Sequence, residues 1–153
     1  MGLDIFTYFG LGCRNVSKLY VPQGYNFDDM LQVLHDEYKE LVLHNKYKNN
    51  FDYNHALFML NKDEFLMSGS LLVKKSDAIP SRISSVNYVE YSELNQVEQE
   101  LNENLDLIQC IVSNKDLKGL PTFRLGEAQQ PSISDYADGE DTMEFLTDLL
   151  KYV

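Results

Sequence analysis

Residues 84–113, SSVNYVEYSELNQVEQELNENLDLIQCIVS, carry the clearest fold signal in the chain. Residues 84–91 are rich in β-favouring side chains, which predicts a strand. Ser92 then caps a predicted helix, and the buried stripe of that helix is Leu94, Val97 and Leu101. Residues 107–112 (LIQCIV) form a nearly continuous apolar run, which is typical of a strand covered on both faces. Strand, helix and strand in this order predict a right-handed βαβ unit in a parallel sheet.

The segments before this unit continue the α/β pattern. Residues 3–9 are apolar enough for a short buried helix, which Gly10 and Gly12 then end. Residues 18–21 predict a short strand, and residues 70–74 predict another. A helix is expected from an Asn26 cap to about His44, with Asp28 and Asp29 in its first turn. After the polar stretch 45–50, residues 51–61 predict a second, shorter helix.

The end of the chain is expected to be mostly loop over residues 113–141, because Gly, Pro, Ser and Asp are frequent there. Within it, Asp138-Gly139 predicts a turn. Asp141 then caps a closing amphipathic helix over residues 142–152. Its apolar face is Met143, Phe145, Leu146, Leu149 and Leu150. The fold class predicted for residues 1–153 is one α/β domain with a partly parallel sheet flanked by helices.

Composition restricts the class of protein. The 153 residues include 13 Lys and Arg against 24 Asp and Glu, a net charge of −11. This balance opposes binding to nucleic acid or to anionic lipid, both of which attract clustered cations. No segment has the about 20 apolar residues that a membrane span needs. Cys13 and Cys110 do not make a disulfide framework of the secreted kind, so we expect a cytoplasmic location.

The first of these cysteines lies in Gly10-Leu11-Gly12-Cys13-Arg14-Asn15. The glycines allow the backbone to approach a substrate closely, and a helical turn could start at Cys13. Aligned N–H groups there would lower the pKa of the thiol and hold a developing oxyanion, and Arg14 would add positive charge. The alternative is that Cys13 is a small buried hydrophobic residue, as a single cysteine in apolar surroundings often is.

Three segments, in order, resemble the catalytic portion of bacterial acyl-CoA reductases of the aldehyde-dehydrogenase superfamily. DIFTYFGLGCRNVSKLYVP, residues 4–22, resembles the active-site cysteine segment. Residues 84–113 resemble the late strand-helix-strand unit of the family. GEAQQPSISDYADGEDTMEFL, residues 126–146, resembles its closing Gly-x-x-Gln-x-Pro…Asp-Gly segment. The resemblance therefore spans nearly the whole chain and implies an aldehyde-dehydrogenase-like catalytic domain.

This resemblance implies a two-step activity. Cys13 would attack an acyl-CoA, expel coenzyme A and keep the acyl group as a thioester. Hydride from NADPH or NADH would then reduce the thioester to an aldehyde. Gly12 and the Cys13 N–H would form the oxyanion pocket, Arg14 and Asn15 would contact the substrate, and Gln129, with Asp138, would shape the mouth of the site.

The same resemblance also implies partners. The dinucleotide-binding domain of the family normally precedes the cysteine segment, and only twelve residues precede Cys13 here. The chain also has no Gly-rich βα turn followed by an acidic residue. We therefore expect the upstream cofactor domain to be absent, and either that missing N-terminal domain or a homo-oligomer to be the protein partner. The alternative function is a non-catalytic oligomerisation or partner-binding domain derived from the family.

Other candidate groups have simpler interpretations. His35, His44 and His55 would make a cysteine hydrolase only if one of them paired with Cys13, and solvent-facing or capping histidines are more usual. No histidine or cysteine spacing indicates a metal site. The acidic run Asp135, Asp138, Glu140 and Asp141 lacks the register of a calcium loop. Cys110, within the apolar run, is expected to be a core residue.

Overall fold

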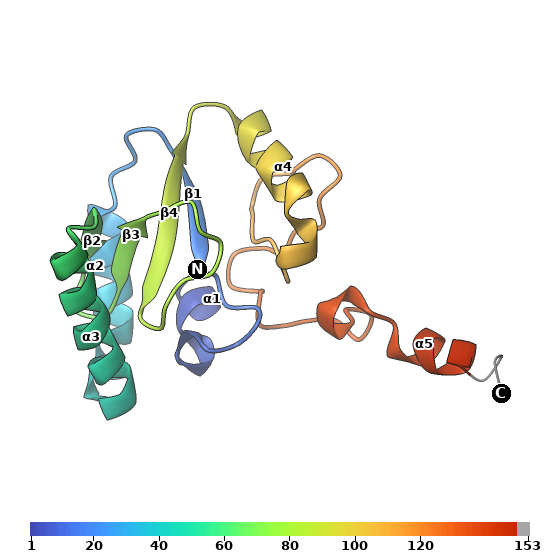
Figure 1. Ribbon diagram of the computed structural model, residues 1–153, viewed down its shortest axis with the longest axis horizontal. Coiled ribbons are helices and arrows are strands. Elements are labelled where there is room, and N and C mark those ends of the chain that lie inside the picture. The colour runs from blue at the N-terminus through green and yellow to red at the C-terminus, as the bar shows by residue number, and fades with distance from the viewer. Residues whose placement is uncertain (150–153) are drawn as a thin grey trace.

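The computed structural model describes residues 1–149, without the side chains of Asp138 and Leu149, and its fold is α/β (Figure 1). Four strands form one open sheet in the order β1-β4-β3-β2. Their bounds are Lys18–Pro22 for β1, Phe65–Met67 for β2, Leu72–Lys75 for β3 and Ser85–Tyr91 for β4. β4 runs parallel to β1 and to β3, and only β2 is antiparallel to its neighbour. The predicted class, a partly parallel sheet with helices, is confirmed.

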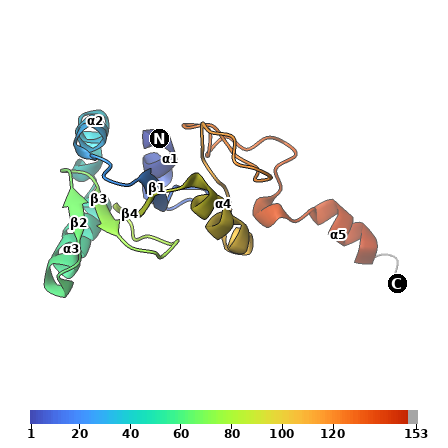
Figure 2. The ribbon, with the colours of Figure 1, turned by 90° about the horizontal axis from the view of Figure 1, so that it is seen from above.

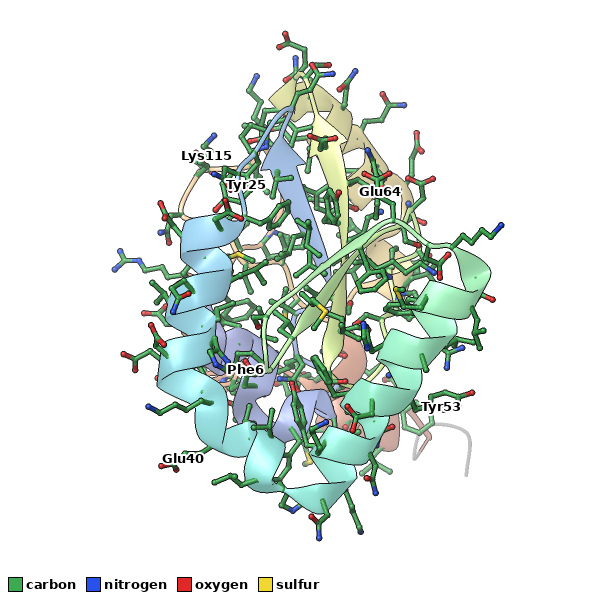
Figure 3. The ribbon with its side chains drawn as sticks, turned by 90° about the vertical axis from the view of Figure 1, so that its left-hand side faces the viewer. Phe6, Tyr25, Glu40, Tyr53, Glu64 and Lys115 are labelled. Atoms are coloured by element: carbon green, nitrogen blue, oxygen red, sulfur yellow. The ribbon has the colours of Figure 1, made fainter. Side chains whose placement is uncertain are left out.

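The first face of the sheet is covered by α1 (Gly2–Phe6) and α2 (Asp28–Tyr38). Successive strand residues point to opposite faces, and here the inward set joins one core cluster with both helices. That cluster includes Leu19, Val21, Val73, Val86 and Tyr88 from the strands and Ile5, Phe6, Phe27, Leu31 and Leu34 from the helical side. The Phe6 side chain lies on the α2 side of the sheet (Figure 3), and its ring packs against the Tyr38 ring with centroids 4.6 Å apart, which links α1 to α2.

The second face is covered near its two edges by different helices (Figure 2). Near β2 and β3, Leu72 packs against Phe51 and Phe58 of α3 (Asn45–Asn61). Near β1, Tyr20 packs against Val97 of α4 (Leu94–Glu103). Between them, the loop after β3 is held on the sheet by Asn87. The amide of this buried residue donates to Ala78 O at 2.9 Å and to Pro80 O at 3.0 Å.

Two helix predictions need correction. The N-cap of α2 is Phe27 rather than the predicted Asn26, although Asn26 Oδ1 does accept from the N–H of Asp28, the first helical residue, at 2.8 Å. The α-helix ends at Tyr38, and a 3₁₀ helix continues over Lys39–Leu43. Residues 45–50, expected to be a polar connection, belong to α3 instead. The reason is burial: Tyr47 is 2% exposed and its hydroxyl donates to Ser70 O, so tertiary packing outweighs the polar composition.

The prediction of a strand over residues 107–112 is wrong. A 3₁₀ helix occupies Leu105–Leu107, and an isolated bridge joins Val112 to Phe123. The predicted βαβ unit of residues 84–112 is therefore wrong as well, because both edges of β4 are already paired, one with β1 and the other with β3. The apolar run has another use: Ile111 and Ile108 pack against α4. A helix-covering segment and a doubly covered strand have the same apolar pattern.

The chain after residue 113 is mostly loop, as predicted, with a 3₁₀ helix over Ala137–Gly139. α5 (Thr142–Leu149) follows and stands away from the sheet (Figures 1 and 2). Asp141 caps it as predicted, since its Oδ1 accepts from the Met143 and Glu144 N–H groups, each at 3.0 Å. The predicted continuation over residues 150–152 lies outside the described residues. None of the helices within residues 1–149 is long and apolar enough to cross a membrane.

Candidate functional site around Cys13

Cys13 lies exposed in a turn between α1 and β1. A 3₁₀ helix, Thr7–Gly10, follows α1, and inside it Tyr8 and Phe9 adopt left-handed conformations with φ of 55° and 60°. Such conformations are costly for non-glycine residues and persist only where surrounding contacts enforce them. The chain then passes through turns to β1, so the helical turn predicted to start at Cys13 is absent from this described segment. The thiol is therefore presented by a tight turn.

Asn15 holds this turn together. Its amide nitrogen donates to three carbonyl oxygens at the end of the preceding helix, Asp4 O at 3.0 Å, Ile5 O at 3.1 Å and Thr7 O at 3.0 Å. Its Oδ1 accepts from the Gly12 N–H at 2.6 Å. Asn15 was predicted to contact substrate, whereas here its polar atoms are engaged with the backbone. Its observed role is to fix the chain on both sides of Cys13.

A distant segment of the chain, residues 126–129, is fastened to the same turn by Asp4. This carboxylate is fully buried and accepts from the Gly126 N–H at 2.7 Å and from the Ala128 N–H at 3.1 Å. Arg14 adds a further link, because its Nε donates to Ala128 O at 2.6 Å while its guanidinium lies 4.4 Å from the centre of the Phe123 ring. The positive charge predicted beside the thiol is thus directed toward residues 123–128.

Gln129 consequently lies beside Gly12: its Oε1 is 3.6 Å from the point that a Cβ on Gly12 would occupy. The structure therefore brings Gly12, Arg14, Asn15 and Gln129 together around Cys13. Asp4, which organises this arrangement, was not recognised in the sequence. The available signal was an acidic residue inside the otherwise apolar segment 3–9.

Four hydrogen-bond donors around the Cys13 turn have no partner within the described chain, and one of them is the buried Arg14 Nη2. The Gly12 N–H, predicted to serve the oxyanion, is occupied by Asn15. The N–H groups of Cys13 and Arg14 make no hydrogen bond with residues 1–149. Gln129 Nε2 is buried and also unpaired in this part of the chain. Buried polar groups are normally satisfied, so an unpaired one is a candidate ligand contact.

Two hollows of different character meet at Cys13. One is a cleft of about 200 Å³ with a mixed lining, to which Ser17, Arg82 and Ser84 contribute polar groups and Phe6, Phe9 and Leu71 apolar ones. The other is a largely apolar groove of about 440 Å³. Its walls come from β1, α4 and the segment after α4, and include Tyr20, Leu94, Val97, Leu101, Leu107 and Ile108. The groove has the size usual for small-molecule sites, and Cys13 lines both hollows.

The second cysteine lines this apolar groove as well. Cys110 is half-buried, and its thiol donates to Arg14 O at 3.4 Å. Burial raises the pKa of the Cys110 thiol, and the nearby Arg14 charge opposes that rise. The predicted core residue is therefore only partly in the core and stands at the wall of the site.

The alternatives based on histidine find little geometric support. His35 packs against Gly69, His44 against the Phe9 ring and His55 between Phe51 and Phe65. Within the described residues none of the three hydrogen-bonds to Cys13. In the same part of the chain, no group of three or more His, Cys, Asp or Glu side chains is placed to hold a metal ion.

The residues that the structure describes do not fit a dinucleotide cofactor by themselves. A dinucleotide fold binds pyrophosphate at the start of the helix that follows the first strand. Here that helix, α2, begins with Asp28 and Asp29, whose negative charges would repel phosphate.

Comparison with known proteins gives no further guide: no family model, curated protein or solved structure matches the chain.

Proposed function

We propose that Cys13 is the acyl-accepting nucleophile of an enzyme of the acyl-CoA reductase type, within an aldehyde-dehydrogenase-like catalytic domain. The observation that carries the proposal is the position of the exposed Cys13 where an apolar groove meets a cleft that is lined in part by polar side chains. An acyl thioester has the matching shape, an apolar chain and a polar carrier joined at one reactive carbonyl. The resemblance of residues 4–22 to the cysteine segment of that family supports the same function.

In the proposed step, the Cys13 thiolate attacks the carbonyl carbon of the acyl-CoA. The bond to the coenzyme A sulfur then breaks, that sulfur leaves as a thiolate and takes up a proton, and the acyl group stays on Cys13 as a thioester. The unpaired N–H groups of Cys13 and Arg14 and the unpaired Gln129 amide are the donors for the oxyanion that forms on the way. Asn15 and Asp4 act as positioning residues.

The two hollows have distinct roles in this proposal. The acyl chain lies in the apolar groove against Leu94, Val97 and Ile108. The carrier leaves through the cleft of mixed lining, where Arg82 is exposed and has no ion-pair partner among residues 1–149, so its guanidinium can bind phosphate.

Reduction of the thioester needs a hydride from NADPH or NADH, which a separate cofactor-binding domain would supply. Since the described residues do not fit a dinucleotide, we assign only acyl transfer to this chain.

The test is the rate of coenzyme A release at limiting concentrations of straight-chain acyl-CoAs of increasing length. Each buried methylene contributes about 0.8 kcal/mol, so the second-order rate constant rises about fourfold per methylene until the groove is filled. Leu94→Ser, in the groove wall, flattens this dependence, whereas Leu60→Ser, 80% exposed on α3, leaves it unchanged. A wild-type rate that is independent of chain length contradicts the assignment of the groove as the acyl-chain site. No release of coenzyme A at all contradicts the assignment of Cys13 as the nucleophile.

A second candidate function is association with another polypeptide through α5. Met143, Phe145 and Leu146 are 68%, 60% and 49% exposed on a helix that stands away from the sheet. Exposed apolar faces of this kind favour association. Sedimentation of the wild type and of Phe145→Ser distinguishes the two functions. A dimer that the variant disrupts supports association, and a monomer at high concentration contradicts it.

A further inference from the structure

We propose that Cys110 is a resolving cysteine, which forms a reversible disulfide with Cys13 when a peroxide oxidises the Cys13 thiol. This inference concerns a modification of the site and does not depend on acyl transfer by Cys13. It is based on geometry: both cysteines line one groove, and the Cys110 sulfur lies 3.4 Å from the carbonyl oxygen of Arg14, the residue directly after Cys13.

The chain around Cys110 is able to make the small movement that a bridge requires. A disulfide needs the two Cα atoms to be within about 7 Å of each other. Neither Gln109 nor Cys110 donates a backbone hydrogen bond to any described residue, and the regular pairing of this segment is one isolated bridge at Val112. Cys13 is in an exposed turn rather than in a helix or strand. Both partners are thus outside the sheet ladder.

The two thiols differ in a way that assigns their order of reaction. Cys13 is exposed and meets a dissolved peroxide directly, whereas Cys110 is half-buried. Burial also raises the pKa of Cys110, which keeps it protonated and disfavours its own oxidation. A neutral thiol waiting beside an exposed one is the arrangement of a resolving cysteine.

The chemistry balances with a peroxide as the oxidant. The Cys13 thiolate attacks one peroxide oxygen, the O–O bond breaks, and Cys13 becomes a sulfenic acid while the other oxygen leaves as water or alcohol after taking a proton. The Cys110 sulfur then attacks the Cys13 sulfur and loses its proton, and the hydroxyl group leaves as water. The product is one disulfide, which a dithiol reduces back to both thiols.

The experiment treats the folded full chain with hydrogen peroxide, quenches by alkylation in denaturant and measures intact mass. The wild type is expected to lose two hydrogen atoms and to recover fully with dithiothreitol, with peptide mapping joining Cys13 to Cys110. In Cys110→Ser, Cys13 instead gains two or three oxygen atoms irreversibly, at a rate at least about tenfold above that of the wild type. In Cys13→Ser, Cys110 stays a thiol.

Urea unfolding of the variants establishes that they are folded, and Cys110→Ala replaces Cys110→Ser if the serine variant is not. Equal irreversible oxidation of Cys13 in the wild type and the Cys110 variant overturns the proposal. So does a disulfide that forms only between chains, which is recognised by a dimer on a non-reducing gel whose yield rises with protein concentration.

Discussion

Replacing Asp4 by Asn tests how residues 126–129 are held beside the Cys13 turn. The buried carboxylate accepts from the Gly126 N–H at 2.7 Å and the Ala128 N–H at 3.1 Å. An asparagine of the same shape keeps one acceptor oxygen and turns an NH₂ group toward the second N–H. The ion pair with the N-terminal ammonium group, 3.0 Å from Asp4 Oδ2, and one charge-assisted hydrogen bond are then lost, and one buried N–H is left unpaired. The free energy of unfolding therefore falls by about 2–4 kcal/mol.

The assay for Asp4→Asn is urea unfolding combined with amide hydrogen exchange. With a denaturant slope of about 2 kcal/mol per molar urea, the midpoint falls by about 1–2 M. The amides of Gly126 and Ala128 exchange faster, because the bonds that protect them are weakened. Asp116→Asn is the matched control, since Asp116 is exposed and its carboxylate makes no hydrogen bond or ion pair with residues 1–149. A midpoint within about 0.3 M of the wild type would refute the reasoning.

Three further predictions concern the turn and its thiols. Asn15→Asp lowers the melting temperature by about 5–10 °C, which is more than Asn15→Ala lowers it, because the new carboxylate faces three carbonyl oxygens. Calorimetry measures the melting temperatures of both variants. Gly12→Ala slows alkylation of Cys13, because the new Cβ would lie 2.7 Å from Asn15 Oδ1 and the turn must shift; an unchanged alkylation rate contradicts this. Iodoacetamide labels Cys13 faster than Cys110 at neutral pH. The ratio of the two labelling rates falls toward one as the pH rises toward the raised pKa of Cys110. Equal labelling rates at pH 7 would contradict this prediction.

The parts of the fold that follow from local sequence were predictable. β1, β3 and β4 lie within a residue or two of the predicted strands, because β-favouring residues bounded by Pro and Gly specify them locally. β2 was missed because it has only three residues, between charged residues and a glycine. Residues 107–112 were misassigned because an apolar run does not reveal whether a helix or a sheet covers it.

In the candidate site, too, local sequence predicts some features, whereas contacts between distant residues determine the others. The turn at Cys13 could be predicted from its glycines, whereas the position of Gln129 beside Gly12 depends on contacts between residues far apart in the sequence. The hydrogen bonds that join Asp4 to Ala128 connect residues 124 positions apart, and no local pattern records such a pair. The groove likewise depends on α4, which packs beside β1 only in the folded chain.

The most direct measurement of the proposed function is intact-mass analysis after incubation of the folded chain with one short and one long acyl-CoA. We expect the wild type and Cys110→Ser to gain the mass of one acyl group, and hydroxylamine to remove it, as it does a thioester. Cys13→Ala should gain nothing. An adduct that persists in Cys13→Ala, or a folded wild type that gains none, would contradict the assignment of Cys13 as the acyl acceptor.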